Sequence, residues 1–253
     1  MKYRQFTFIL LSIIYSNIVS SQVNVRDSAV EGFVFNFGLG AYVPSGDVAE
    51  RFGNNMALGF DAFYKTQSNW LIGPSFNYIF GNDVKDLEQL FEDLTTEGGN
   101  IIGGNGDYAT IKGLQRGWSL SLKSGKVFPL FGPNQNSGLL IQVGAGYLQH
   151  KIYIEDLNDA VPQLDDQNTK GYDHMHGGLV ITQNIAFYHS GNKRVTNFTV
   201  GFEFMQAFTQ NLREYNYDSR SYDLESKLDL FFGIKASWFL PIYNKNVQKF
   251  YYN

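Results

Sequence analysis

Residues 33–43 read FVFNFGLGAYV, and this stretch decides the fold class. Its odd positions carry Phe33, Phe35, Phe37 and further apolar residues, whereas its even positions include Asn36 and Gly38. A period of two residues is typical of a β-strand whose two faces meet different surroundings. The stretch therefore predicts a strand with one apolar face and one face of small or polar side chains.

Seven further runs with the same period follow along the chain, and we predict strands over residues 56–64, 70–80, 118–122, 139–147, 179–187, 198–208 and 228–240. Short connections lie around 67–69, 132–137 and 190–194, and long connections span 45–55, 82–116, 155–173 and 210–227. Tilted strands of about ten residues cross a bilayer, and an even strand number with alternating short and long connections is typical of bacterial outer-membrane barrels. The pattern predicts an all-β fold: a single eight-stranded antiparallel transmembrane β-barrel with short periplasmic turns and long extracellular loops.

The composition agrees with this fold and excludes several functions. The 253 residues are 43% hydrophobic, 16% aromatic and only 17% charged, with 26 Gly, no Cys and a formal net charge of −4. Without cysteine there is no disulfide framework and no thiolate chemistry, and a mildly acidic chain gives no support to nucleic-acid binding. A soluble exported β-sandwich or lipocalin-like barrel is the alternative, but polar faces rich in Gly, Ser and Asn favour a narrow lumen over a solvated surface.

The N-terminus has the layout of a secretory signal peptide. Lys2 and Arg4 precede a short apolar core, and small residues come before Gln22. Such a layout predicts export and removal of the segment. We expect residues 1–21 to be the signal peptide and residues 22–253 to be one barrel domain in the cell outer membrane, in contact with its lipid.

The chain resembles the small eight-stranded outer-membrane barrels of the OmpX and OmpW type. The resemblance rests on the strand and turn pattern and on the Pro44-Ser-Gly-Asp47 turn after the first strand. Residues 237–243 resemble the aromatic-ended strand that the barrel assembly machinery reads, but Pro241 interrupts them and residues 244–253 follow. The assembly signal is therefore Tyr243 or the terminal aromatics at 250–252. Such barrels include adhesins, permeases, lipid-modifying enzymes and non-catalytic partners, so the fold leaves function open.

Six charged residues fall on the inward face by the strand alternation: Asp61, Lys65, Lys123, Glu203, Asp229 and Lys235. An eight-stranded barrel is only wide enough inside for side chains, and an unpaired buried charge is costly. We therefore predict that these residues form a paired luminal charge network that plugs the barrel. A proton or ion path is the alternative.

One helix is expected in the second long loop, over residues 83–94. Leu87, Leu90, Phe91 and Leu94 lie at i, i+3, i+4 and i+7, which places them on one helical face. A loop of this length that carries its own amphipathic helix is unusual. The stripe either packs on the mouth of the barrel or forms a partner surface.

The sequence indicates no catalytic, cofactor-binding or metal-binding residues. His174-Met-His176 could offer two metal ligands, but ordinary loop histidines are the favoured interpretation, and no G-x-S-x-G motif occurs. We expect a non-catalytic structural or interaction component, an accessory subunit of a larger envelope complex with an outer-membrane or periplasmic protein partner. A small-solute or hydrophobic-ligand permease is the first alternative, and a lipid-modifying enzyme is the second.

Overall fold

The computed structural model describes residues 29–85, 87–96, 98, 100–104, 106–157, 161–164, 168–191 and 196–243. The expected signal peptide and the terminal aromatics at 250–252 lie outside these residues, whereas Tyr243 is the last residue of the final barrel strand.

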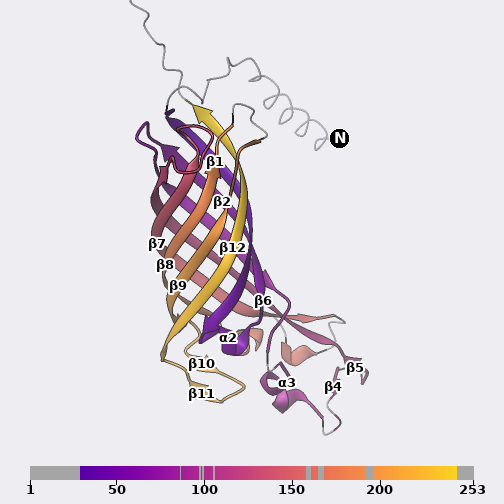
Figure 1. The fold of residues 1–253 in the computed structure, drawn as a ribbon. Helices are drawn as coiled ribbons and strands as arrows, with labels where there is room; N and C mark the ends of the chain where they lie inside the picture. The colour runs from indigo at the N-terminus through magenta and orange to yellow at the C-terminus, as the bar shows by residue number, and fades with distance from the viewer. Residues whose placement is uncertain are drawn as a thin grey trace, which may run out of the picture.

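Eight long strands among the described residues form one closed antiparallel barrel (Figure 1). They are β1 (Gly32–Gly46), β2 (Asn55–Lys65), β3 (Trp70–Gly81), β6 (Ile111–Phe128), β7 (Gly138–Asp156), β8 (His176–His189), β9 (Phe198–Asn211) and β12 (Ser226–Tyr243). Neighbours in sequence pair throughout, and β1 pairs with β12 to close the ring, with Gly32 opposite Tyr243 and Gly46 opposite Asp229. The predicted fold class is confirmed.

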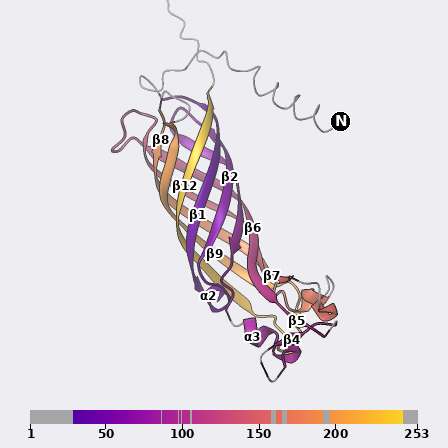
Figure 2. The ribbon, with the colours of Figure 1, turned by 90° about the vertical axis from the view of Figure 1, so that its right-hand side faces the viewer.

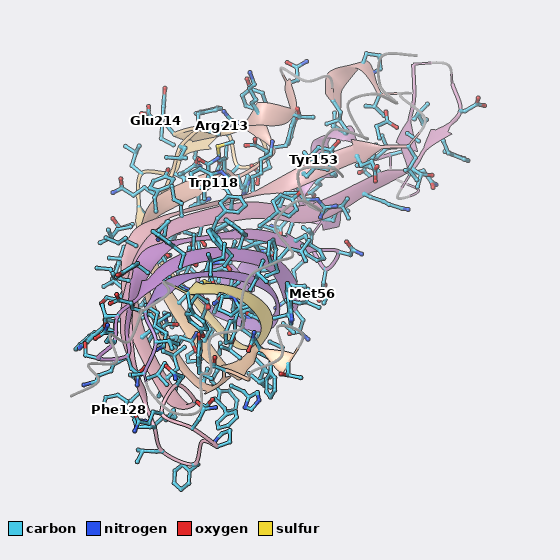
Figure 3. The ribbon with its side chains drawn as sticks, turned by 90° about the horizontal axis from the view of Figure 1, so that it is seen from above. Met56, Trp118, Phe128, Tyr153, Arg213 and Glu214 are labelled. Atoms are coloured by element: carbon cyan, nitrogen blue, oxygen red, sulfur yellow. The ribbon has the colours of Figure 1, made fainter. Side chains whose placement is uncertain are left out.

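The predicted alternation of the two faces is also confirmed. In β1, Phe33 and Phe37 are exposed on the outer surface, while Val34 and Asn36 are buried inside. Seen from above, side chains stand on both sides of the ring of strands (Figure 3). The outer face carries aromatic pairs such as Phe37 with Phe60, whose ring centroids lie 5.2 Å apart. A closed barrel with an apolar outer band leaves no backbone group unpaired in lipid, so this band faces the bilayer.

The long connections gather at one end of the barrel, opposite the end where the described chain begins and stops (Figures 1 and 2). They contain the short helix α2 (Val48–Arg51), the 3₁₀ turns η2 (Pro162–Leu164) and η3 (Asn168–Gly171), and two small hairpins. The hairpins are β4 (Ile101–Ile102) with β5 (Tyr108–Ala109), and β10 (Tyr215–Asn216) with β11 (Ser221–Tyr222). No helix in the described part of the chain is long and apolar enough to cross a bilayer.

The helix expected over residues 83–94 is shorter than predicted. Only α3 (Leu87–Leu90) and the 3₁₀ turn η1 (Glu92–Leu94) form. The segment before them is held extended, because Val84 bridges to Phe52 and the Lys85 backbone N–H donates to the Arg51 carbonyl at 2.9 Å. These contacts with the segment 51–52 keep residues 84–85 out of the helix, although the apolar period predicts a helix there.

The alternation of turn lengths sets the expected orientation: short turns in the periplasm and long loops outside. Because the chain has no native cysteine, single cysteines report this directly. Ser221→Cys, in the β10–β11 hairpin, should react with a membrane-impermeant maleimide on whole cells, and Gln67→Cys, in the β2–β3 turn, should react only after the outer membrane is permeabilised. If only Gln67→Cys were labelled on intact cells, the barrel would have the opposite orientation to the one predicted here.

Candidate functional site

Four of the predicted luminal charges meet in the middle of the barrel. Lys123 Nζ lies 3.2 Å from Glu203 Oε2, and Lys235 Nζ lies 3.6 Å from both Glu203 Oε2 and Asp61 Oδ1. All four residues are buried. They come from β2, β6, β9 and β12, so the ion pairs connect strands across the lumen. Two lysines and two carboxylates make the cluster electrically balanced.

Polar neighbours complete the contacts of this central charge cluster. Ser75 donates to Asp61 at 2.5 Å, and Lys235 donates to Asn77 at 3.0 Å. The space for Lys235 depends on Gly59, because a Cβ at Gly59 would lie only 2.9 Å from Lys235 Nζ. Small residues on the inward face are therefore needed for the long charged side chains to fit.

Lys65 does not join this cluster. It is the last residue of β2 and lies at the short-turn end, where Nζ donates to the Val30 carbonyl at 2.9 Å and to Asn136 Oδ1 at 2.8 Å. The prediction of one network of six residues is wrong for Lys65, because its height in the barrel is set by its place at the strand end. Its partners are neutral oxygens.

Asp229 lies apart as well, in a second network at the long-loop end. Its Oδ2 accepts from Thr209 at 2.6 Å and lies 2.8 Å from His150 Nε2, and its Oδ1 lies 3.8 Å from Arg51. Asp229 pairs with Gly46, the last residue of β1, so the register places it near the barrel mouth. The single-network prediction is therefore also wrong for Asp229.

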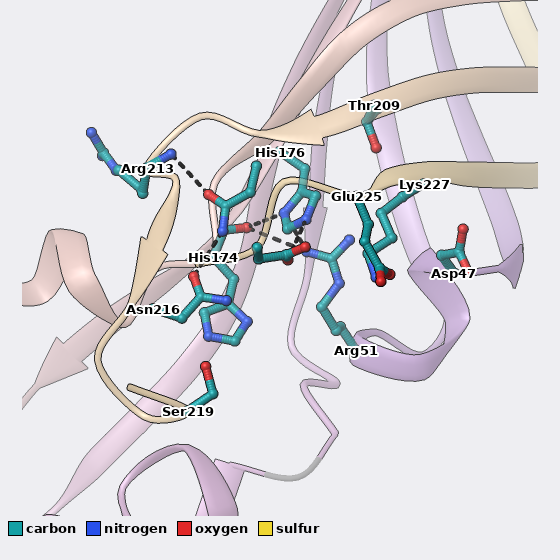
Figure 4. A network of polar contacts seen from close by, with 12 residues as sticks. Asp47, Arg51, His174, His176, Thr209, Arg213, Asn216, Ser219, Glu225 and Lys227 are labelled. Atoms are coloured by element: carbon teal, nitrogen blue, oxygen red, sulfur yellow. Dashed lines mark hydrogen bonds and ion pairs between the residues drawn. The ribbon is translucent and has the colours of Figure 1, made fainter. Parts of the chain in front are cut away.

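Arg51 projects from α2 into this mouth network (Figure 4). Its Nη1 lies 2.7 Å from His176 Nδ1 and donates to the His174 carbonyl at 3.3 Å. His176 Nδ1 also lies 2.8 Å from the His174 carbonyl, so Arg51 and the imidazole meet at the same carbonyl oxygen. The contact holds α2 against the start of β8 over the mouth.

Sequence reasoning missed Arg51 and His150. His150 has the same parity along β7 as the inward residue Gln142, so the alternation could have identified it. Arg51 lies in a four-residue helix and carries no periodic signal. His174 contacts Asp218 at 2.9 Å. No three His, Cys, Asp or Glu side chains in the described ranges are grouped to hold a metal ion.

Apolar clusters close the lumen on both sides of the central charge cluster. Toward the long loops, buried Tyr42, Phe52 and Phe231 form part of one cluster. Toward the short turns, Tyr188 and Phe239 stack with ring centroids 4.4 Å apart in a second one. The lumen is therefore filled by side chains in three layers: apolar, charged and apolar.

The stripe in the second long loop packs on its own chain. Leu90 and Phe91 are buried in the apolar cluster near the mouth, and Leu87 and Leu94 pack against it partly buried. The Phe91 ring lies 5.8 Å from the Tyr172 ring of the third long loop. For this stripe the sequence predicts either packing on the barrel mouth or a partner surface. Leu90 and Phe91 pack on their own chain and are buried there, so they do not form a partner surface.

The third and fourth long loops are also joined. Asp173 Oδ2 accepts from Arg213 Nη2 at 2.7 Å, and Oδ1 accepts from Arg213 Nε at 3.1 Å. This bidentate hydrogen bond raises the pKa of the Arg213 guanidinium. Together with α3, η1 and the two small hairpins, these loops form a folded lobe over one end of the barrel, which we call the loop lobe (Figure 2).

A closed barrel with an apolar outer band and a filled interior defines an outer-membrane β-barrel protein. No protein-family model matches the chain, and no curated protein matches it. Among solved structures it is similar to Ail of Yersinia pestis, with 11% identity, a TM-score of 0.42 and coverage of 83% of this chain and 99% of Ail.

Neisserial surface protein A has 8% identity and a TM-score of 0.42, with 82% of this chain and 96% of that chain covered. The outer membrane protein OprG of Pseudomonas aeruginosa has 14% identity and a TM-score of 0.38, with 85% and 99% covered. At these identities the likeness concerns the fold alone.

Removal of the central carboxylate should destabilise the barrel. Glu203→Leu leaves Lys123 buried without a countercharge, which typically costs about 3–5 kcal/mol, whereas Lys235 keeps Asp61. Urea unfolding in phospholipid vesicles, followed by tryptophan fluorescence, measures the loss. The double variant Glu203→Leu/Lys123→Leu should recover most of the stability. Equal unfolding midpoints for the single variant and the wild-type protein would contradict the pairing.

Truncation of the buried stripe should loosen the loop lobe. Leu90→Ser and Phe91→Ser each remove a buried apolar side chain, at a usual cost of about 2–5 kcal/mol. We expect amide exchange over residues 84–95 to accelerate by roughly 30-fold or more. Gln89→Ser, at an exposed position of the same helix, is the control and should leave exchange unchanged. Wild-type exchange in both stripe variants would mean that the stripe is not held by its own chain.

Proposed function

We propose that this chain is a non-catalytic interaction protein of the outer membrane, an accessory component of a larger envelope assembly, with residues 1–21 as its signal peptide and 22–253 as the mature barrel. The observation that carries the proposal is the filled lumen. Ion pairs in the centre and the Tyr188–Phe239 stack beside them occupy the barrel axis. The strand exterior faces lipid, so binding is left to the exposed ends of the barrel, and we assign it to the loop lobe at the end with the long loops.

The loop lobe has the properties of a binding surface. Its interior is packed through the described residues Leu90, Phe91 and Tyr172. Its outer surface presents large apolar side chains beyond the barrel, among them Tyr108 at 69% exposed and Tyr222 at 71% exposed. Exposed apolar groups with polar rims are typical of protein–protein interaction sites, where tyrosine is enriched.

The mouth network has a structural role, because it joins three strands of the barrel. His150 and Thr209 both contact the same oxygen of Asp229, so the carboxylate stands between the imidazole and the hydroxyl. Through Asp229, strand β12 is tied to β7 by His150 and to β9 by Thr209. These three residues therefore act as a structural lock on the mouth.

Site-specific photocrosslinking in living cells tests the proposal. A photoreactive phenylalanine analogue at Tyr108 or Tyr222 should give a discrete protein adduct, because both side chains point out of the loop lobe. The same analogue at Phe76, on the lipid-facing side of β3, is the control and should give none. The adduct formed from Tyr108 or Tyr222 should persist in the Glu203→Gln variant, since the lumen takes no part in binding.

Two results would count against this function. One is the absence of protein adducts from both lobe positions. The other is a steady ion conductance of purified protein in planar bilayers, because a filled lumen cannot conduct. Conductance would favour the permease alternative.

A further inference from the structure

The short turn between β6 and β7, residues 129–137, has an exposed apolar tip. Phe131 is 94% exposed, and Pro129 and Leu130 are exposed beside it. The Phe131 backbone has φ 62°, in the left-handed region that bulky residues rarely adopt. The turn projects sideways from the barrel wall (Figure 2). A large apolar side chain is thus displayed outward by a backbone conformation that favours glycine.

The remainder of this turn is bound firmly to the end of the barrel. Asn134 Nδ2 donates to the Ser190 carbonyl at 2.8 Å, and Asn134 Oδ1 accepts from the Asn136 backbone N–H at 2.8 Å. Asn136 Oδ1 in turn accepts from the buried Lys65 at 2.8 Å. Because these contacts set the position of the turn, the place of its tip relative to the barrel is also set.

The apolar tip continues the lipid-facing surface of the barrel. Phe128 ends β6 (labelled in Figure 3), and Trp70 begins β3 on the neighbouring strand. Lys126 Nζ lies 5.8 Å from the Trp70 ring centroid and 5.7 Å from the Phe128 ring centroid. Aromatic rings accompanied by a lysine mark the boundary between acyl chains and headgroups. Phe131 lies just beyond this boundary in sequence.

We propose that the β6–β7 turn is a membrane-docking element whose Leu130 and Phe131 insert at the headgroup–acyl boundary of the leaflet on the short-turn side. Lipid is the favoured occupant, because Trp70 and Phe128 beside the turn are exposed on the lipid-facing surface, and apolar residues beside a basic one bind interfaces. This inference goes beyond the proposed function, since the turn lies at the opposite end from the loop lobe.

Spin labels on single cysteines test the insertion in nanodiscs of phosphatidylcholine and phosphatidylglycerol, where both faces of the bilayer are accessible. Collisions with oxygen report an apolar surrounding, and collisions with a water-soluble nickel chelate report water. A label at Phe131→Cys should be several-fold less accessible to nickel than a label at Ser68→Cys, in the exposed β2–β3 turn at the same end. Nickel accessibility at position 131 equal to that at position 68 would overturn the proposal.

Two further labels serve as controls. One tests whether the barrel spans the disc, and the other tests the tip with Phe131 left in place. Phe76→Cys, in the lipid-facing band, should exclude nickel, and its exposure to nickel would mean that the barrel does not span the disc. A label at Leu130→Cys keeps Phe131 in place and should also exclude nickel. Adding Phe131→Gly, which suits the backbone conformation, should raise nickel access at position 130. A photoreactive phenylalanine analogue at position 131 reports a protein neighbour in cells. If it formed a protein adduct, and position 131 were accessible to nickel in nanodiscs, the occupant would be a protein and lipid docking would be overturned.

Discussion

The pairing of β1 with β12 is the interaction on which the rest of the structure depends. In a bilayer every backbone N–H and C=O needs a partner within the protein, and only closure of the sheet supplies one to both edge strands. Closure with eight strands also sets a narrow interior. Each inward side chain must then fit against those of the opposite wall, and the buried Lys123 does so with Glu203 as its countercharge.

The strands and their faces could be predicted because lipid and lumen place opposite demands on alternate residues. This constraint acts only within the bilayer. β6 begins at Ile111, well before the predicted start at Trp118, because its first residues rise into the loop lobe, where an apolar outer face is not required. The helix of the second long loop also lies outside the bilayer. It begins later than its apolar period predicts, because Val84 pairs with Phe52 in an extended conformation.

The luminal residues could be predicted by parity, but their grouping could not. Parity indicates which side of the wall a residue occupies. The height of the residue along the barrel axis depends on its place in the strand and on strand stagger, which parity does not give. Lys65 and Asp229 share the inward face with Glu203 and yet lie toward opposite ends. Arg51 shows a further limit of periodicity, because a residue in a single turn of helix is positioned by loop packing alone.

The central charge cluster has a consequence for the order of assembly. Glu203 binds Lys235 of the last strand, and Lys235 binds Asp61 of the second, so the cluster joins residues from nearly opposite ends of the chain. Contacts between residues so far apart in sequence form late, because the entropic cost of closing the long chain segment between them must be met first. Until β12 docks on β1, Lys235 is missing from the cluster, and Asp61 has no lysine beside it. The docking of β12 on β1 therefore closes the sheet and completes the luminal ion pairs in a single step.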